Sequence, residues 1–486
     1  MERLNKELIG KKERPVKVVQ FGEGNFLRAF VDYMIDIANE QGKFDGSIVL
    51  IKPIEFGNLN VFHEQDCQYT VQLRGMVDGQ AKVLSRVVTS VADAVDAYGE
   101  YEKYNDLAKI DTLRFVVSNT TEAGIVYDEE DRFELCPPKT FPGKLTKFLH
   151  TRFQAFGGDE SKGLVMLPVE LIDDNGIMLK KCVMQQIENW GLSQEFKNWV
   201  DQACVFTSTL VDRIVTGYPR DEIQGIWESL GYEDRALVTG EPFGLWVIES
   251  QKDISGELPL PEAGLPVIFT DNQKPYKQRK VRILNGAHTS FVLASYLAGN
   301  DIVLESMQDD TIRNFMLQTI YEEVIPTLTL PKDELEEFAG AVVGRFNNPY
   351  VKHALLSISL NSVSKWRARC MPSLLGYIEK NGCLPRHLTF SIAALMAFYT
   401  GSEIRDKALI GHRDGQEYNI MDDMPVLEFF RDNSGKPAAE FVKAYLGRED
   451  FHGQDLNQVE GLTEAVTAYL EDIRANGMRA ALCKIS

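Results

Sequence analysis

The sequence predicts an α/β domain with a mainly parallel sheet, followed by a second domain that is mainly α-helical. In the first half, short apolar runs rich in β-branched residues alternate with stretches of helical periodicity. From about residue 280 onward the pattern is helical, and convincing β runs are absent. A stretch marked by proline and glycine, residues 255–275, separates the halves, so we place the domains at residues 1–274 and 275–486.

The expected strands of the parallel sheet are four short apolar runs, at residues 16–21, 47–51, 113–117 and 164–167. An amphipathic stretch over residues 25–41 follows the first run, as expected for a helix that crosses over to the next parallel strand. Residues 69–74 and 81–88 flank Asp78-Gly79, a pair that favours a tight hairpin turn. We therefore expect an antiparallel insertion in the first domain.

Several stretches of the second half show the 3.6-residue period of amphipathic helices. They cover residues 280–298, 309–325, 333–344, 371–380, 387–400, 437–446 and 458–478. Ligand sites lie preferentially between domains, so the cleft between the α/β and the helical domain is the expected site.

Composition and charge narrow the class of partner. The 486 residues include 52 Lys and Arg against 71 Asp and Glu, a formal charge of -19 that disfavours nucleic acid and anionic membranes as partners. An anionic ligand would then need a locally basic pocket. The seven cysteines are scattered without a C-x-x-C pair, and the polar N-terminus resembles no signal peptide. These features predict a cytoplasmic protein with reduced thiols.

A glycine turn follows the first expected strand. Gly22 and Gly24 stand where a dinucleotide fold places its phosphate turn, because glycine lets the backbone approach a pyrophosphate at a helix N-terminus. Leu27 replaces the third glycine of G-x-G-x-x-G, and Lys52 stands where an acidic ribose ligand is usual. The pattern alone leaves two interpretations open: a nucleotide site, or a tight turn without one.

The segment that opens the second domain combines lysine, asparagine and histidine. On an α-helix with roughly 100° per residue, Lys280, His288 and Asn285 lie at about 0°, 80° and 140°, on one side. They suit a carbonyl reductase as proton donor, substrate-orienting group and neutral hydrogen-bond donor, respectively. Gly286 indicates close approach by another group. The alternative is a solvated basic turn followed by a core histidine.

Two further candidates are weaker. Thr120 and Thr121 follow the strand at 113–117, at the sheet edge where ligands bind, but a helix cap explains them nearly as well. Lys365 and Arg369 form a basic cluster that could hold a substrate carboxylate or could be a solvated face. No metal site is expected, because the remaining histidines show no ligand spacing: His63, His150, His353, His387, His412 and His452.

Together these residues resemble the polyol-specific long-chain dehydrogenase (mannitol dehydrogenase) family. The resemblance rests on a G-x-G-x-F-x-R turn (22–28), a V-D-R segment (211–213) and a K-x4-N-x2-H segment (280–288). Longer strings add to it, including SNTTEAGI (118–125), PVELIDDNG (168–176) and GRFNNPYVKHALLSISLN (344–361). Within the family, the strings are most similar to those of enzymes that reduce D-tagaturonate to D-altronate.

The resemblance implies a Rossmann-like first domain with insertions, a helical second domain, NAD as cofactor and no metal. It implies that Lys280 is the acid/base, that Asn285 stabilises the alkoxide and that His288 orients the substrate. The implied cofactor-binding residues are Gln20, Phe21, Gly22, Glu23, Gly24, Asn25, Phe26 and Arg28, with Thr120 and Thr121. The implied partner is a small uronate, bound by a monomer or homodimer.

Several alternatives stay open within and beyond this resemblance. The resemblance also implies a second catalytic asparagine, but our alignment with residues 169–171 puts Leu171 at that position. Lys52 could favour a 2′-phosphate and hence NADP. A fructuronate or mannitol enzyme of the same family is the nearest rival function. A non-catalytic sugar-acid or nucleotide sensor is the rival from another class.

Overall fold

The computed structural model describes residues 1–121 and 123–485 and divides the chain into two compact units. The first unit comprises residues 1–75 and 82–273, and the second comprises residues 76–81 and 274–486. A parallel sheet lies in the first unit, whereas the second is mainly helical, so the predicted fold class is confirmed. In the described part of the chain, no helix is long and apolar enough to span a membrane.

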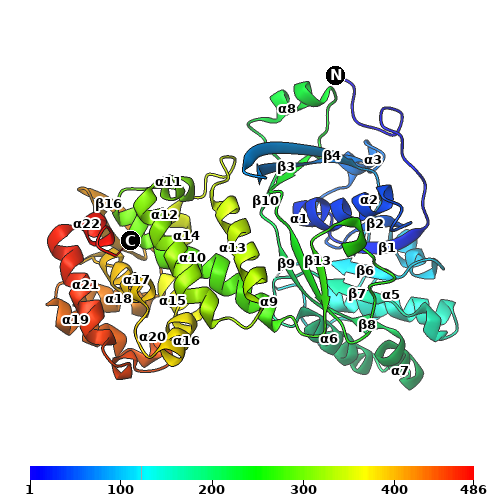
Figure 1. Ribbon diagram of the computed structural model, residues 1–486. Helices are drawn as coiled ribbons and strands as arrows, with labels where there is room; N and C mark the ends of the chain where they lie inside the picture. Colours follow the sequence, from blue (N-terminus) through cyan, green and yellow to red (C-terminus); the bar gives the residue numbers. More distant parts are fainter. Residues whose placement is uncertain (122, 486) are drawn as a thin grey trace. The chain divides into compact units, whose positions relative to one another are not determined.

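A six-stranded parallel sheet lies at the centre of the first unit (Figure 1), in the order β5-β2-β1-β6-β7-β8. Its strands are β1 (Val16–Phe21), β2 (Ser47–Lys52), β5 (Val91–Asp96), β6 (Phe115–Ser118), β7 (Val165–Pro168) and β8 (Val205–Phe206). In register, Val19 pairs with Val49 of β2 on one side and with Val116 of β6 on the other. The strand order reverses between β1 and β6, and the carboxyl ends of these strands form the usual ligand crevice of such sheets.

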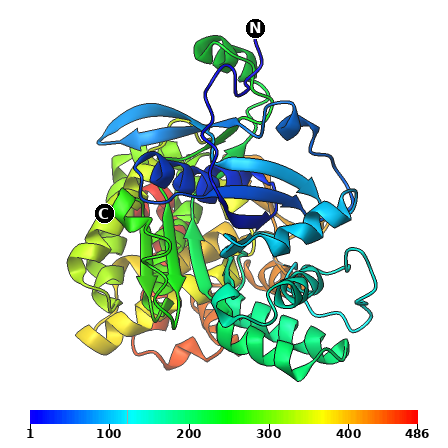
Figure 2. The same ribbon diagram turned by 90° about the vertical axis from the view of Figure 1, so that its right-hand side faces the viewer.

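Alternating side chains of this sheet divide the core of the first unit in two. Along β1, Val18 belongs to one apolar cluster and Val19 to the other, as expected for a strand buried on both faces. The first cluster includes residues of η1 (Arg28–Asp32) and α2 (Tyr33–Glu40). The second includes residues of α5 (Phe141–Ala155), α6 (Asn175–Asn189) and α7 (Gln194–Ala203), the helices on the other face (Figures 1 and 2).

The predicted hairpin is confirmed. Strands β3 (Tyr69–Val77) and β4 (Gln80–Val88) are neighbours, and Asp78 and Gly79 have φ of 53° and 74°, as a type I′ turn requires. They belong to a four-stranded sheet with β10 (Val215–Gly217) and β11 (Val238–Gly240). A further sheet, not anticipated from the sequence, contains β9 (Ser208–Asp212), β12 (Leu245–Glu249) and β13 (Val267–Thr270).

Helix α10 (Gly286–Leu297) is central in the second unit. Nearly all its residues are buried, and it contacts α12 (Asp310–Gln318), α14 (Leu355–Ile358), α15 (Ser362–Arg369) and α17 (Arg386–Phe398). Further helices are α9 (Lys274–Arg279), α13 (Lys332–Phe346), α16 (Met371–Asn381), α19 (Ala438–Leu446) and α21 (Leu462–Asn476). The expectation of no β structure here is wrong, because β14 (Ile404–Arg405), β15 (Ala408–Arg413) and β16 (Gln416–Ile420) form an antiparallel sheet.

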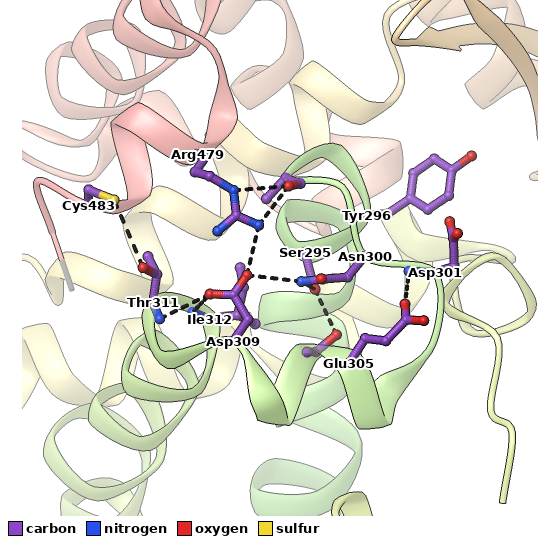
Figure 3. Close-up of polar contacts among 12 residues, drawn as sticks. Ser295, Tyr296, Asn300, Asp301, Glu305, Asp309, Thr311, Ile312, Arg479 and Cys483 are labelled. Carbon is purple, nitrogen blue, oxygen red and sulfur yellow. Dashed lines mark hydrogen bonds and ion pairs between the residues drawn. The ribbon is translucent and has the colours of Figure 1, made fainter.

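A polar network fixes the C-terminal end of α10 (Figure 3). Arg479, on α22 (Met478–Leu482), donates to the Ala298 carbonyl and to Asp309 Oδ2, both at 2.8 Å. Asn300 donates to Ser295 Oγ at 3.1 Å and to the same Asp309 oxygen at 3.2 Å. Asp309 also caps α12 through its other carboxylate oxygen. The network therefore anchors the helix whose N-terminal end carries the candidate catalytic residues.

Candidate active site

The glycine turn after β1 has two glycines with different roles. Gly22 has φ of +124°, and a Cβ there would lie 3.2 Å from Leu27 Cδ1 and 3.3 Å from the Asn119 carbonyl. Gly24 has ordinary extended backbone (φ −68°, ψ 166°), and a Cβ there would meet nothing within 4 Å. The fold thus requires glycine at position 22, whereas Gly24 leaves open space before the first amides of α1 (Asn25–Leu27). This cradle fits a dinucleotide pyrophosphate.

The buried Arg28 holds the turn in shape. Its guanidinium donates to the Glu23 carbonyl at 3.1 Å, to Asn25 Oδ1 at 2.7 Å and to the Ala236 carbonyl. It also lies over the ring of Tyr69. These contacts engage the guanidinium within the first unit, so Arg28 positions the turn rather than reaching outward.

Arg213, from the V-D-R segment, holds the helical segment that follows the glycine turn in the same way, by donating to backbone carbonyls. It donates to the carbonyls of Ala29 at 2.6 Å, Phe243 at 2.9 Å and Pro242 at 3.2 Å, and its guanidinium lies over Phe30. Five guanidinium N–H groups can satisfy several carbonyls at once, which explains arginine at a site of this kind.

The other predicted cofactor residues of the turn differ in exposure. Gln20 is buried and donates to the Gly22 carbonyl at 3.2 Å, and the fully buried Phe21 ring packs in the core. Glu23 and Phe26 are half-buried, and Asn25 is exposed. The side chains of Gln20 and Phe21 therefore support the turn from inside, and the exposed surface of the turn comes from its next residues.

A buried glutamate organises the neighbouring loop after β6. Glu170 accepts hydrogen bonds from Thr120, through both its amide and its hydroxyl at 3.0 Å, and from Ser118 Oγ at 3.1 Å. Burial raises the pKa of Glu170, while these hydrogen bonds favour its charged form. Thr121 is exposed with φ of 104°, and Glu122 lies outside the described residues. Sequence patterns missed Glu170, although it lies in the PVELIDDNG string.

Lys52 at the end of β2 is engaged within the chain. Its ammonium donates to the carbonyls of Ile54 at 2.7 Å, Glu55 at 3.2 Å and Phe56 at 3.4 Å, and pairs with Asp96 at 3.1 Å. The side chain is buried, so Lys52 shapes the loop after β2. This engagement removes the one local feature that favoured a 2′-phosphate.

The segment with the predicted acid/base is not an α-helix. Residues Lys280–Asn285 form a π-helical segment, η5, between α9 and α10. A π turn closes from residue i to i+5, so Lys280 and Asn285 lie one turn apart on the same face. His288 follows three residues later in α10, again on that face. The predicted alignment by an α-helical period is wrong here, but the π segment brings the three residues to one side.

Gly286 allows close packing between helices. A Cβ there would lie 3.2 Å from the Arg369 carbonyl at the end of α15 and 3.4 Å from the Val281 carbonyl. The close approach predicted from this glycine is therefore that of α15. Arg369 in turn donates to Thr289 Oγ1 at 3.3 Å, and that hydroxyl donates to the Asn285 carbonyl at 2.9 Å.

His288 lies among aromatic rings and cations. Its imidazole stacks on Phe346 with ring centroids 4.1 Å apart and meets the ring of His353 edge-on at 5.5 Å. Nε2 is buried without a hydrogen-bond partner in the described chain, although the residue as a whole is half-buried. Burial, followed by the charges of His353, Arg345 and Arg369, holds the pKa of His288 well below its usual range. The imidazole is therefore neutral at neutral pH.

A cationic group surrounds this histidine. The predicted residues Lys365 and Arg369, four apart on α15, lie on one face, and the charges of both act on His288. Burial, then Arg369, lowers the pKa of Lys365, which donates to the Ile358 carbonyl at 3.0 Å. The structure adds Arg345 of α13, which sequence patterns missed, and the ring of His353, whose pKa burial lowers, so that it is a neighbour of His288 but no cation. The positive charges of Arg345, Lys365 and Arg369 act on His288 in a chain of charge -19.

Both parts of the chain match one family. Residues 16–262 match the mannitol dehydrogenase Rossmann domain, and residues 272–474 match the mannitol dehydrogenase C-terminal domain. Altronate oxidoreductases of Escherichia coli, from strain K12 and from O7:K1 (strain IAI39 / ExPEC), are each 45% identical over 489 residues, covering 99% of both sequences.

Two solved structures share the fold over nearly the whole chain. Pseudomonas fluorescens mannitol 2-dehydrogenase, in a ternary complex with NAD and D-mannitol, has a TM-score of 0.65 and 22% identity, covering 99% of each chain. A substrate-free D-sorbitol dehydrogenase has a TM-score of 0.77 and 20% identity, covering 99% of this chain and 100% of that chain. These similarities support the Rossmann-like domain and the helical domain expected above.

Proposed function

The chain belongs to the mannitol dehydrogenase family, and on that premise we propose that it reduces D-tagaturonate to D-altronate with NADH, reversibly. The coarser activity, NAD-linked oxidation and reduction of a sugar acid at a CH–OH group, is that of the altronate oxidoreductases it resembles at 45% identity. The finer proposal adds the substrate, the direction and the residues that act.

The observation that carries the proposal is the cationic group around His288. Arg345, Lys365 and Arg369 place positive charge beside a neutral imidazole, in a chain whose net charge repels anions. A uronate carries a carboxylate, whereas mannitol and fructose carry none. Arginine and lysine hold carboxylates by charge-assisted hydrogen bonds, so this group supports a sugar acid over a neutral polyol.

The proposed proton chemistry uses the face shared by Lys280, Asn285 and His288. When bound, NADH supplies a hydride to the keto carbon, and the electron pair of the C=O bond moves to the oxygen. The protonated Lys280 gives its proton to that oxygen, so that a hydroxyl forms and the lysine is left neutral until water reprotonates it. In oxidation, the neutral amine takes the hydroxyl proton.

Asn285 and His288 keep their protonation states through this sequence. The Asn285 amide donates a hydrogen bond to the oxygen where charge develops, which stabilises the transition state more than the ground state. The neutral His288 has its buried Nε2 available to bond a neighbouring substrate hydroxyl. Two hydrogen bonds, from Arg369 to Thr289 and from Thr289 to the Asn285 carbonyl, connect the cations proposed to bind the substrate carboxylate with the residue proposed to stabilise the alkoxide.

Replacing Lys280 with alanine tests the mechanism. A positioned acid/base contributes about 10²–10⁴ in rate, so Lys280→Ala should lose that much turnover of tagaturonate while the NADH dissociation constant barely changes. Lys332→Ala, at an exposed lysine of α13, is the matched control and should leave both constants unchanged. Turnover by Lys280→Ala within about threefold of the wild type would contradict the assignment.

A substrate panel separates the remaining alternatives. Purified protein is mixed with NADH and, separately, with tagaturonate, fructuronate and fructose, and loss of NADH absorbance is followed. The proposal expects the highest kcat/KM for tagaturonate. Preference for fructuronate would assign the rival uronate enzyme, preference for fructose a polyol enzyme, and binding of NADH without turnover of any substrate a sensor.

A further inference from the structure

A second pocket of the first unit lies far from the glycine turn. It is a cavity of about 480 Å³ at the amino ends of β2 and β5, lined also by the N-terminal segment and the chain after α3 (Asn60–His63). The parallel strands of the sheet put their amino ends on the edge opposite the glycine turn, roughly 20 Å away for a six-residue strand. A ligand of this pocket is therefore separate from the dinucleotide, and the inference below does not rest on the proposed function.

Three potential metal ligands converge in this pocket. One ligand atom each of His63, Cys67 and Asp93 lies within 4.8 Å of the other two. His63 is exposed at the end of α3, the buried Cys67 follows four residues later, and Asp93 comes from β5, which contacts α3. Sequence spacing pointed away from a metal site because Asp93 is 26 positions beyond Cys67 in the chain and only the fold brings it near.

The backbone between the first two ligands is unusual. Asp66 and Cys67 both have left-handed conformations, with φ of 50° and 56°, although neither is glycine. The Cys67 amide donates to the Phe62 carbonyl at 2.7 Å, which closes the chain into a tight turn after α3. This turn holds the thiol on the side of β5.

The donor set selects the class of metal. A thiolate, an imidazole and a carboxylate suit Zn²⁺ and its spectroscopic substitute Co²⁺, whereas Mg²⁺ and Ca²⁺ prefer oxygen alone. Three protein ligands leave one tetrahedral position for water from the pocket. We propose that His63, Cys67 and Asp93 bind one Zn²⁺ ion. On binding, the metal–sulfur bond replaces the S–H bond and the thiol proton leaves to solvent, so no electron transfer is involved.

Charged neighbours tune this site. The Lys11 ammonium donates to the Asp66 carbonyl at 2.5 Å, one residue before Cys67 in the chain. The exposed Lys103 pairs with Asp93 at 2.9 Å and also lies 3.6 Å from Glu100. When Asp93 coordinates the metal, Lys103 can still pair with Glu100. Lys103 is therefore the cation that competes most directly with the metal for Asp93.

Cobalt titration of the chelator-treated full chain tests the proposal. The wild type should bind one Co²⁺ per chain and develop the near-ultraviolet absorption of a thiolate-to-cobalt bond. Cys67→Ser should lose that absorption, and His63→Gln should weaken Co²⁺ and Zn²⁺ binding at least about tenfold, because each removes a ligand. Cys383→Ser, at an exposed cysteine, is the matched control and should bind like the wild type.

A variant that is expected to raise the affinity for Zn²⁺, instead of lowering it, makes the test more specific. Lys103→Met removes the ammonium that pairs with Asp93, so the affinity of this variant for Zn²⁺ should rise about threefold, measured by competition with a chelator dye. His63→Gln changes an exposed side chain and keeps the test valid if Cys67→Ser fails to fold. A wild type without thiolate–cobalt absorption, or absorption that persists in Cys67→Ser or stays undiminished in His63→Gln, would overturn the proposal.

Discussion

Replacing Gly24 with valine tests whether the turn after β1 holds the pyrophosphate of the cofactor. The structure separates this test from an effect on folding, because Gly24 has ordinary extended backbone and a Cβ there would meet no protein atom within 4 Å. Exchanging glycine for an apolar residue at a helix N-cap costs about 1 kcal/mol or less. We therefore expect a folded variant whose free energy of unfolding changes little.

The effect on binding should be larger. The branched side chain would fill the open space before the first amides of α1, where a pyrophosphate must approach the backbone. The NADH dissociation constant should rise at least about tenfold, or roughly 1.4 kcal/mol. Calorimetric titration with NADH measures this directly, and urea unfolding of the same sample measures the stability.

Gly22→Ala is the matched comparison and should behave in the opposite way. Its φ of +124° costs an alanine about 1–3 kcal/mol, and the added Cβ would crowd Leu27 and Asn119 at 3.2 and 3.3 Å. Its main effect should be on stability. An unchanged NADH dissociation constant in folded Gly24→Val would remove the turn from the cofactor site and refute the reasoning.

Three further predictions concern the substrate, a buried carboxyl and the end of α10. Lys365→Met should raise the KM for tagaturonate much more than that for fructose, and equal effects would place the carboxylate elsewhere. Burial raises the pKa of Asp32 to about 7, so its contribution to stability is present below pH 4 and lost as pH rises through 7. Asp32→Asn should remove this loss, which is about 2.7 kcal/mol between pH 5 and 8 in urea unfolding at those two pH values; parallel curves for both proteins would contradict it. Asp309→Ala should lower the free energy of unfolding by about 1–2 kcal/mol through the lost cap and the Arg479 pair, and a change below about 0.5 kcal/mol would argue against this network.

The sequence was sufficient for four of the six strands of the parallel sheet, because these are short apolar runs bounded by polar turns, whereas β5 and β8 were not predicted. The hairpin at Asp78-Gly79 was predictable for a similar reason, since that pair favours positive φ at both positions. The same signal at Asp414-Gly415, with φ of 51° and 80°, marks the hairpin of β15 and β16. This hairpin was not predicted, although residues 401–436 lie outside the helical stretches expected in the second domain.

The arrangement around His288 could be predicted only in part. Lys365 and Arg369 stood out as a basic cluster, since they lie four residues apart on one helix. Arg345 and His353 could not be grouped with them from spacing, because each comes from another segment and only the packed chain brings the Arg345 charge and the His353 ring to the imidazole. Long-range contacts of this kind leave no periodic trace in a single sequence.

The helical geometry predicted for Lys280, Asn285 and His288 is wrong, because residues Lys280–Asn285 are π-helical. On an α-helix, five residues would place Lys280 and Asn285 about 140° apart, at the two edges of the predicted face. The π segment closes one turn over those five residues and so places them on one face, with His288 about 60° away in the following α-helical turn. Nothing in the apolar pattern distinguishes a π turn from an α turn, since both bury Ile283 and Leu284. A local departure from the regular helix therefore accounts for the placement on which the proposed chemistry depends.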